Sequence, residues 1–275
     1  MIEEFPALDW RDMNLRRRLG RQPLAALWMS IGSTTIIELA RAAQPDAIVI
    51  DMQHGLWDRV SLECAVGAVA AGASALVRVA DNTAMCIGQA LDTGAEGVIV
   101  PLIETSDEAA RAVAAARFPP QGRRSGGGVR PLAGDFLAYC KSANERTVVG
   151  VMIETTRGVD NAAAIAQTQG VDFVLIGTGD LALSLGAGEG RAARHEDACR
   201  HVLQACCNAK IPCAIFTATV EQAITRVREG YAMVIAANDI AVVSRGFSEA
   251  MCRFKKELRI EDHDGAAGSS RFKEP

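Results

Sequence analysis

The chain has 275 residues, a length that suits one α/β barrel or two smaller domains. Apolar residues make up 49% and aromatic residues only 5%, which favours an α/β protein built on aliphatic strands. The formal net charge of −4 gives no support for nucleic acid or anionic membrane partners. No apolar run approaches the roughly 20 residues of a membrane span. The acidic start M-I-E-E-F-P lacks a signal-peptide pattern, so we expect a cytoplasmic protein.

The first part of the chain alternates apolar runs with helical segments. A basic helical piece comes first, at Asn14–Arg21, and we expect its three consecutive arginines, Arg16 to Arg18, to form a solvated face. Buried strands are predicted at 24–30, 46–51, 75–79 and 97–101, and helices follow them at 34–43, 59–71, 83–92 and 106–116. Each strand is therefore followed by one helix.

The alternation breaks at residues 118–146, which contain P-P-Q-G-R-R-S-G-G-G-V-R-P. So many glycines predict a mobile loop, with a helix near Asp135–Ala143. The three glycines are unlike a phosphate-binding loop, because no strand precedes them and no G-K-[ST] follows.

The alternation then resumes and continues almost to the end of the chain. Strands are predicted at 148–153, 172–176, 212–216 and 232–236, and helices at 158–167, 195–209, 220–229 and 242–259. A loop is expected after Asp180, through Gly186–Gly190, and a disordered tail at 261–275.

Eight strands, each followed by a helical segment, predict a closed (β/α)₈ TIM barrel forming one domain over residues 1–260. A doubly wound open sheet is the alternative. It is disfavoured because no G-x-G-x-x-G stands at any junction from strand to helix.

The eight cysteines form no C-x-x-C pair. Several of them lie on helix or strand faces that we expect to be buried. Reduced, inert thiols are therefore favoured over disulfides or a zinc site.

Polar residues stand at the carboxyl ends of nearly all the predicted strands. They are Trp28, Asp51 with His54, Arg78, Glu154, Asp180, Thr217 and Asn238. In a barrel these ends share one rim, where active sites are built. The alternative for either acid is a helix N-cap or a surface loop residue.

Glu154 and Asp180 follow buried strands one βα unit apart, so the pair is expected to hold a divalent metal through oxygen. The metal and Arg78 would both stabilise an oxygen that becomes negative, as in an enolate. His54 would supply a base with an ordinary pKa of about 6.5, oriented by Asp51 or another acid. This equipment suits making or breaking a carbon–carbon bond next to a carbonyl.

Six motifs along the chain are D-M-Q-H-G, V-R-V, L-D-T-G-A-E-G-V-I-V-P, R-F-P-P-Q-G-R-R, V-M-I-E-T and G-T-G-D-L. With these motifs, in the same order over roughly residues 14–255, the chain resembles the HpcH/HpaI family of class II, metal-dependent pyruvate aldolases. That family includes 4-hydroxy-2-oxo-heptanedioate aldolase and 2-keto-3-deoxy sugar-acid aldolases. The resemblance implies cleavage of a 4-hydroxy-2-oxo acid to pyruvate and an aldehyde.

The resemblance also implies roles for individual residues. Glu154 and Asp180 would ligate Mg²⁺, Mn²⁺ or a similar ion, and Arg78 would contact the C2 oxygen of pyruvate or its enolate. His54, paired with Asp92, would serve the acid/base step through a metal-associated water.

The remaining implied contacts shape the substrate pocket. Backbone N–H groups of Gly179 and Asp180, in the turn Gly177-Thr178-Gly179-Asp180, would bind the substrate carboxylate. Trp28 would wall the pocket, and Phe216 would line its aldehyde side. The family's barrel exchanges its last helix between subunits and assembles as a hexamer, and the apolar helix Val242–Phe254 is consistent with that homo-oligomer.

Two motifs depart from the family pattern. Met152 stands where the family usually has Gln, and G-T-G-D at residues 177–180 replaces G-P-A-D. A second branch of the superfamily resembles a citrate synthase of siderophore biosynthesis, which condenses oxaloacetate with acetyl-CoA. A site without the Gln could also fit that branch, and a non-catalytic barrel that binds a keto acid is a third alternative.

Overall fold

The computed structural model describes residues 14–70 and 72–258. The chain divides into two compact units, Met1–Asp239 and Ile240–Pro275. The predicted helix end at Arg259 and the predicted tail at 261–275 lie outside the described residues. Every strand lies in the first unit, whereas nearly all of the last helix lies in the second. A single domain over 1–260 therefore stays a prediction.

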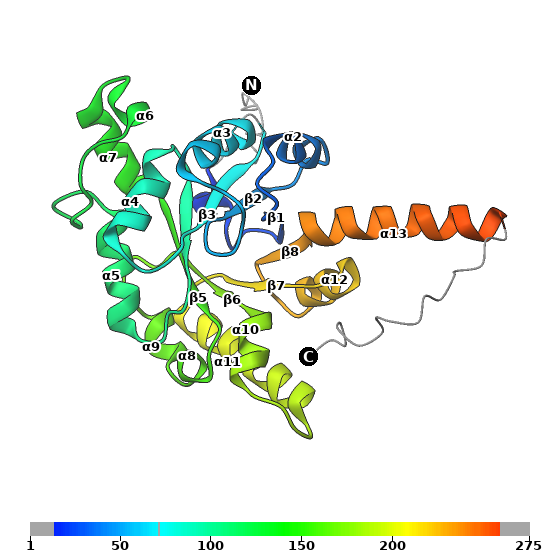
Figure 1. Ribbon diagram of the computed structural model, residues 1–275. Helices are drawn as coiled ribbons and strands as arrows, with labels where there is room; N and C mark the ends of the chain where they lie inside the picture. Colours follow the sequence, from blue (N-terminus) through cyan, green and yellow to red (C-terminus); the bar gives the residue numbers. More distant parts are fainter. Residues whose placement is uncertain (1–13, 71, 259–275) are drawn as a thin grey trace, which may run out of the picture. The chain divides into compact units, whose positions relative to one another are not determined.

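Eight parallel strands close into a barrel in the order β1 to β8, and β8 pairs with β1 (Figure 1). The closed barrel is confirmed, and the open sheet is wrong. The register between β1 and β8 shifts between Ala26 and Leu27, leaving Ala236 as an extra residue. The strands are β1 Leu24–Met29, β2 Ala47–Asp51, β3 Ser74–Arg78, β4 Gly97–Val100, β5 Val148–Ile153, β6 Phe173–Ile176, β7 Cys213–Phe216 and β8 Met233–Asn238.

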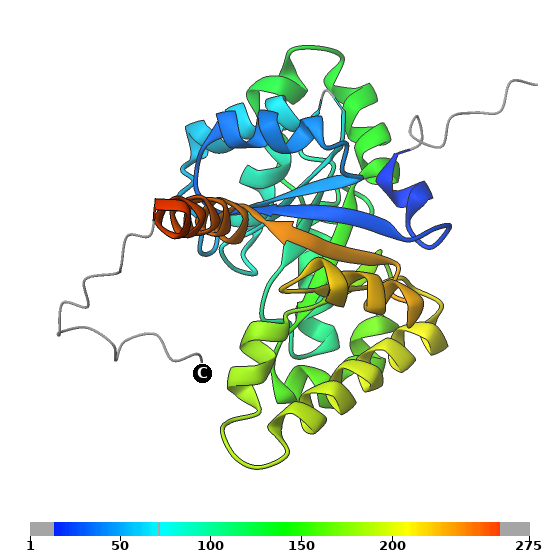
Figure 2. The same cartoon turned by 90° about the vertical axis from the view of Figure 1, so that its right-hand side faces the viewer.

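Helices connect the strands and surround the barrel (Figures 1 and 2). Many begin at a Ser, Thr or Asp whose side chain accepts a hydrogen bond from the first turn, as Ser33, Asp58 and Thr105 do. The helices of the first unit are α1 Leu15–Arg18, α2 Thr34–Ala42, α3 Arg59–Val69, α4 Ala84–Asp92, α5 Ser106–Ala116, α6 Val129–Leu132, α7 Phe136–Arg146, α8 Thr156–Asp160, α9 Ala162–Ala166, α10 Thr178–Ser184, α11 Arg191–Ala209 and α12 Val220–Arg228.

Side chains alternate between two apolar clusters along each strand, as the two-residue period of a strand requires. The larger cluster lies between strands and helices, and the smaller one fills the barrel interior. The interior cluster includes Val49, Leu76 and Met152. The inward rows continue two positions later with Asp51, Arg78 and Glu154, so polar side chains replace apolar ones at the carboxyl rim.

Helix α1 contributes to the barrel interior. Leu15 is fully buried in the interior cluster, and its N–H donates to the carboxylate of Glu96. Arg18 is also buried and forms an ion pair with Asp46, whereas Arg17 is exposed. The expected solvated arginine face is therefore wrong for Arg18, because its charge is neutralised at this contact.

The segment predicted as a mobile loop contains α6 and α7 together with an aromatic cluster. The rings of Phe118, Phe136 and Tyr139 pack on one another at centroid distances of 6.1–6.4 Å. The guanidinium of Arg124 lies 4.5 Å from the Phe118 ring centroid and is almost fully buried. These contacts give the segment a small core of its own.

Helix α13, Asp239–Leu258, has 20 residues and exposes a series of large apolar side chains. They are Ile240, Val242, Phe247, Met251, Phe254 and Leu258. Charged residues interrupt this series, and no helix in the described part of the chain is both long and apolar enough to cross a membrane.

All eight cysteines lie in the described residues, and all are free thiols. Cys199, Cys206 and Cys213 are buried, as expected of core thiols. Cys64, Cys207 and Cys252 are exposed.

Candidate active site

Asp51 and Arg78 form a buried ion pair at the carboxyl rim. The register of β2 and β3 pairs these two residues directly. The Arg78 Nε donates to Asp51 Oδ1 at 2.8 Å, and an Arg78 terminal nitrogen donates to Oδ2 at 2.6 Å. Such a two-point contact fixes the plane of the guanidinium as well as its position.

Further donors hold the Asp51 carboxylate. Trp28 Nε1 and Ser30 Oγ donate to Oδ2, and the backbone N–H groups of Gln53 and His54 donate to Oδ1. Burial alone would raise the pKa of Asp51, but the hydrogen bonds and charge of Arg78, with the other donors, hold the pKa below its ordinary value. Asp51 therefore stays ionised and acts as the partner of Arg78.

Trp28 packs against Arg78, and Phe216 packs against Trp28. The guanidinium carbon lies 4.9 Å from the Trp28 ring centroid, a distance that gives a favourable cation–π contact. Trp28 and Phe216 meet edge to face, with centroids 5.3 Å apart and an interplanar angle of 82°. The two predicted pocket residues thus pack on each other, and Trp28 of the pair contacts Arg78.

Glu154 is buried at the end of β5, with only 1% of its surface exposed. Its Oε1 accepts a hydrogen bond of 2.8 Å from the N–H of Leu102, a residue whose φ of 54° lies in the left-handed region. Its Oε2 is buried and has no hydrogen-bond partner among the described residues. A buried carboxylate oxygen without a partner is costly, so this atom needs an explanation.

Asp180 lies beside Glu154, in the first turn of α10. The pKa of Glu154 rises from 4.5 to about 7, first because of burial and then because of the charge and proximity of Asp180. The Leu102 N–H and the charge of Arg78 oppose this rise. The sequence-predicted pair of acids therefore converges, because Asp180 is close enough to raise the pKa of Glu154 by its charge.

Gly177 allows the side chains of Glu154 and Met152 to pack directly against the backbone. A Cβ at this position would lie 2.5 Å from Glu154 Oε2 and 2.5 Å from the Met152 methyl carbon. A cation beside Glu154 Oε2 would give this oxygen a partner and would offset the repulsion between Glu154 and Asp180. Oxygen ligands of this kind suit Mg²⁺ or Mn²⁺. The residues present therefore fit a divalent ion. In the described part of the chain no three or more His, Cys, Asp and Glu side chains form a metal-holding group.

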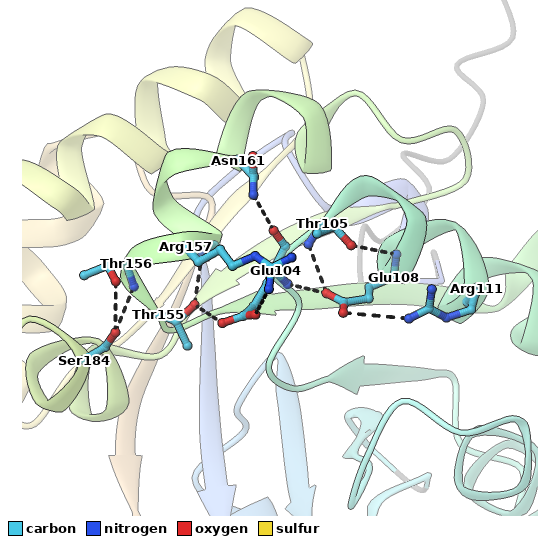
Figure 3. Close-up of polar contacts among 10 residues, drawn as sticks. Glu104, Thr105, Glu108, Arg111, Thr155, Thr156, Arg157, Asn161 and Ser184 are labelled. Atoms are coloured by element: carbon cyan, nitrogen blue, oxygen red, sulfur yellow. Dashed lines mark hydrogen bonds and ion pairs between the residues drawn. The ribbon is translucent and has the colours of Figure 1, made fainter.

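Polar contacts join the segments that follow β4 and β5 (Figure 3). Thr155 Oγ1 donates to a carboxylate oxygen of Glu104 at 2.9 Å, and Asn161 donates to the Glu104 carbonyl at 2.8 Å. The Thr156 N–H donates to Ser184 Oγ at 2.9 Å, which ties the loop after β5 to the last turn of α10. The elements carrying the two acids are thus joined outside the barrel.

His54 is exposed in the turn after β2, on the rim side of the barrel. Asp92 ends α4, the helix that returns the chain to the amino end of β4, and its carboxylate binds Arg124 at 2.9 Å. The fold therefore does not bring Asp92 to His54, because the two residues lie toward opposite ends of the barrel.

Thr217 and Asp239 serve the rim through backbone contacts. Thr217 Oγ1 donates to the Ile235 carbonyl at 2.6 Å. Asp239, which sequence reasoning missed, is buried and accepts bonds from the N–H groups of Ser30 and Ile31. The missed signal was an acid directly after Asn238, at the end of the last strand.

The sequence pattern of a known family covers most of this barrel. The description HpcH/HpaI aldolase/citrate lyase matches residues 24–245. The chain belongs to this family. The expected family is confirmed, and the chain is a carbon–carbon lyase of the aldolase type.

Individual relatives agree with this assignment. The chain is 33% identical over 241 residues to a hydroxypyruvate/pyruvate aldolase of Paraburkholderia phytofirmans, an alignment covering 83% of this chain and 92% of that protein. It is 34% identical over 236 residues to a 5-keto-4-deoxy-D-glucarate aldolase of Salmonella arizonae, covering 83% and 91%. Among solved structures, the citrate synthase SbnG superposes with a TM-score of 0.80 at 27% identity, covering 90% of this chain and 99% of that one.

Proposed function

We propose that the enzyme cleaves a 4-hydroxy-2-oxo acid into pyruvate and an aldehyde, with a divalent metal ion held by Glu154 and Asp180. The observation that carries the proposal is the buried Glu154 Oε2, which lacks a hydrogen-bond partner among the described residues and lies beside a second carboxylate. Aldolase activity in relatives over most of the chain supports the reaction class.

The family is dependent on divalent metals, and Mg²⁺ or Mn²⁺ is the ion we propose. When bound, such an ion would draw electrons from the 2-oxo group of the substrate and orient it. Glu154 and Asp180 would provide two of its oxygen ligands. Asp180 is partly exposed, so an ion held there would be open to substrate from the rim.

Arg78 supplies a fixed positive charge to the substrate. Of its five N–H donors, two bind Asp51, which leaves three for other partners. Because Asp51 and Trp28 hold the guanidinium rigidly, its charge needs no rearrangement when an oxygen becomes negative. We assign Arg78 to the C2 oxygen, where charge develops in the enolate.

His54 is the proposed base. Its imidazole would take the proton of the C4 hydroxyl, the C3–C4 bond would break, and the electron pair would move through C3 to the C2 oxygen. The aldehyde leaves, and a proton returned to C3 completes pyruvate. Within one protomer this role falls to His54 without Asp92.

The substrate pocket that we propose around these groups would be apolar on one side and polar on the other. Trp28 and Phe216 form the apolar wall, on the side where we place the aldehyde. The N–H groups of Gly179 and Asp180 lie in the first turn of α10, where helix geometry leaves them without partners inside the helix. We assign the substrate carboxylate to this turn, which includes Thr178.

The test is pyruvate release from 4-hydroxy-2-oxo acids before and after EDTA, followed by addition of Mn²⁺ or Mg²⁺. We expect EDTA to abolish the activity and the metal to restore it. Added metal should not restore the activity of Glu154→Gln, whereas the matched surface variant Glu38→Gln should behave as the wild type. Activity that survives EDTA, or that survives His54→Ala and Arg78→Ala, would refute the proposal.

A citrate synthase-like condensation is the second candidate. It is favoured by Met152, whose buried side chain lies beside Glu154, and by the structural likeness to SbnG. Its test is thiol release from acetyl-CoA with oxaloacetate, across the same metals. Thiol release without pyruvate release from any hydroxy-oxo acid would favour condensation over aldol cleavage.

We also propose a homo-oligomer, a hexamer in the family's manner, in which a second copy covers the exposed apolar side chains of α13. Light scattering on the purified protein measures the assembly, and a monomer would refute it. The partner of the active site is a small 2-oxo acid. A cytoplasmic location stays a prediction.

A further inference from the structure

The helix that carries Asp180 has little stability of its own. Helix α10 has seven residues, and its N-cap, Gly177, provides no side-chain hydrogen bond. Gly179 occupies its first turn, where glycine costs about 1 kcal/mol relative to alanine. Isolated helices shorter than about 12 residues are marginal in water. The position of Asp180 must therefore come from contacts with neighbouring elements.

Side-chain hydrogen bonds supply these contacts at both ends of α10. Ser184, in the last turn, accepts the bond from Thr156 described above. In the first turn, Thr178 Oγ1 donates to the Phe216 carbonyl at 3.1 Å. The Thr178 carbonyl lies 3.0 Å from Nε2 of His195, on the neighbouring helix α11 (Figure 1). His195 thus binds the residue two positions before Asp180.

The geometry defines which nitrogen of His195 carries hydrogen. A carbonyl oxygen only accepts, so Nε2 must donate to Thr178. On the other side of the ring, Nδ1 lies 3.9 Å from Cys199 Sγ. Burial raises the pKa of the Cys199 thiol to about 11, so at neutral pH the sulfur is protonated and can donate to Nδ1. The imidazole is therefore held from both sides.

We propose that His195 is a positioning residue for the metal site. Its bond to the Thr178 carbonyl holds the first turn of α10 and so directs the Asp180 carboxylate toward Glu154. The inference rests on the proposed metal role of these two acids. His195 touches neither substrate nor metal in this proposal and acts through Thr178. Outer contacts of this kind commonly change metal affinity by about 10–100-fold.

The experiment compares Mn²⁺ affinity, measured by titration calorimetry without substrate, in two variants of equal side-chain length. His195→Gln keeps an N–H donor, and His195→Met removes it. We expect His195→Met to weaken Mn²⁺ binding by about 10-fold or more, and His195→Gln to bind nearly as the wild type does. His201→Ala, at an exposed position of the same helix, is the matched control and should leave the affinity unchanged.

Equal Mn²⁺ affinity in His195→Met and the wild type would overturn the inference and leave the metal proposal standing. Equal weakening in both variants would also overturn it, because packing and not the donor would then matter. If the wild type itself binds no Mn²⁺, the metal proposal fails and the inference with it. Should His195→Met not fold, His195→Asn, with its amide one carbon short of Thr178, replaces it in the comparison with His195→Gln.

Discussion

Ionisation of Glu154 should destabilise the metal-free protein. Burial and the neighbouring Asp180 raise the pKa of Glu154 from 4.5 to about 7. A carboxyl group whose pKa is higher in the folded than in the unfolded state holds its proton more tightly when folded. Its contribution to stability is therefore most favourable below pH 4.5, declines as the pH rises to about 7, and stays at its lowest above that.

The size of this effect follows from the pKa change. Each pH unit corresponds to 1.36 kcal/mol, so the rise from 4.5 to about 7 corresponds to about 3 kcal/mol at high pH. Roughly 2–3 kcal/mol of it should be lost between pH 5 and pH 8. Glu154→Gln keeps an oxygen to accept from Leu102 but carries no charge, so it should lack this loss.

The assay is thermal unfolding of the metal-free protein in EDTA at pH 5 and pH 8. For a chain of this size 1 kcal/mol shifts Tm by about 2–4 °C, so the wild type should lose roughly 5–10 °C more than Glu154→Gln. Adding Mn²⁺ at pH 8 should restore the wild type and leave the variant unchanged. Parallel pH dependence in the two proteins would refute the reasoning, because Glu154 would then ionise without cost.

Other substitutions test the neighbouring contacts. Asp51→Asn leaves the Arg78 charge buried without its counter-charge, so we expect a loss of several kcal/mol in unfolding free energy and a lower kcat for pyruvate release; an unchanged Tm would contradict this. Gly177→Ala places a methyl group 2.5 Å from Glu154 Oε2 and should weaken Mn²⁺ binding in calorimetry, whereas unchanged affinity would mean that the space is not used. Met152→Gln puts an amide beside the free oxygen and should reduce the Tm loss between pH 5 and pH 8; a loss equal to the wild type's would show that the amide does not reach it.

The barrel was predictable because its strands are buried on both faces. Such strands appear as continuous apolar runs, and every predicted strand lies within two residues of the observed one. The rim was predictable for the same reason, since Asp51, Arg78 and Glu154 interrupt rows that are otherwise apolar. An acid at the end of such a row has few structural uses.

The partners of those rim residues were not predictable from the sequence. Asp51 or another acid was expected to orient His54, whereas the ion pair of Asp51 with Arg78, which the register of β2 and β3 creates, was not foreseen. Register depends on how the closed barrel staggers its strands, and no local pattern reports it. The contact between Glu154 and the Leu102 N–H likewise depends on the left-handed backbone conformation of Leu102. The sequence does not indicate this conformation, because the residue is not a glycine.

Helix α10 was missed because its sequence favours a turn. G-T-G-D has two glycines and no side-chain cap, so local propensity predicts the loop that we expected after Asp180. The helix forms because Thr156, Phe216 and His195 bind it from elements distant in the sequence. Tertiary contacts thus override propensity at the element that carries one of the two acids.

The rim has one pair of charged side chains that is neutral and one pair that is negative. Asp51 and Arg78 neutralise each other, and their hydrogen bonds satisfy the buried carboxylate. Glu154 and Asp180 place two negative charges together, and the oxygen between them has no donor among the described residues. Retaining the buried Glu154 beside a second acid, at a cost of about 3 kcal/mol, makes physical sense when a cation restores the charge balance. The same charge imbalance that destabilises the metal-free protein would then favour metal binding. The pH dependence of stability and the metal affinity would therefore both depend on the repulsion between Glu154 and Asp180.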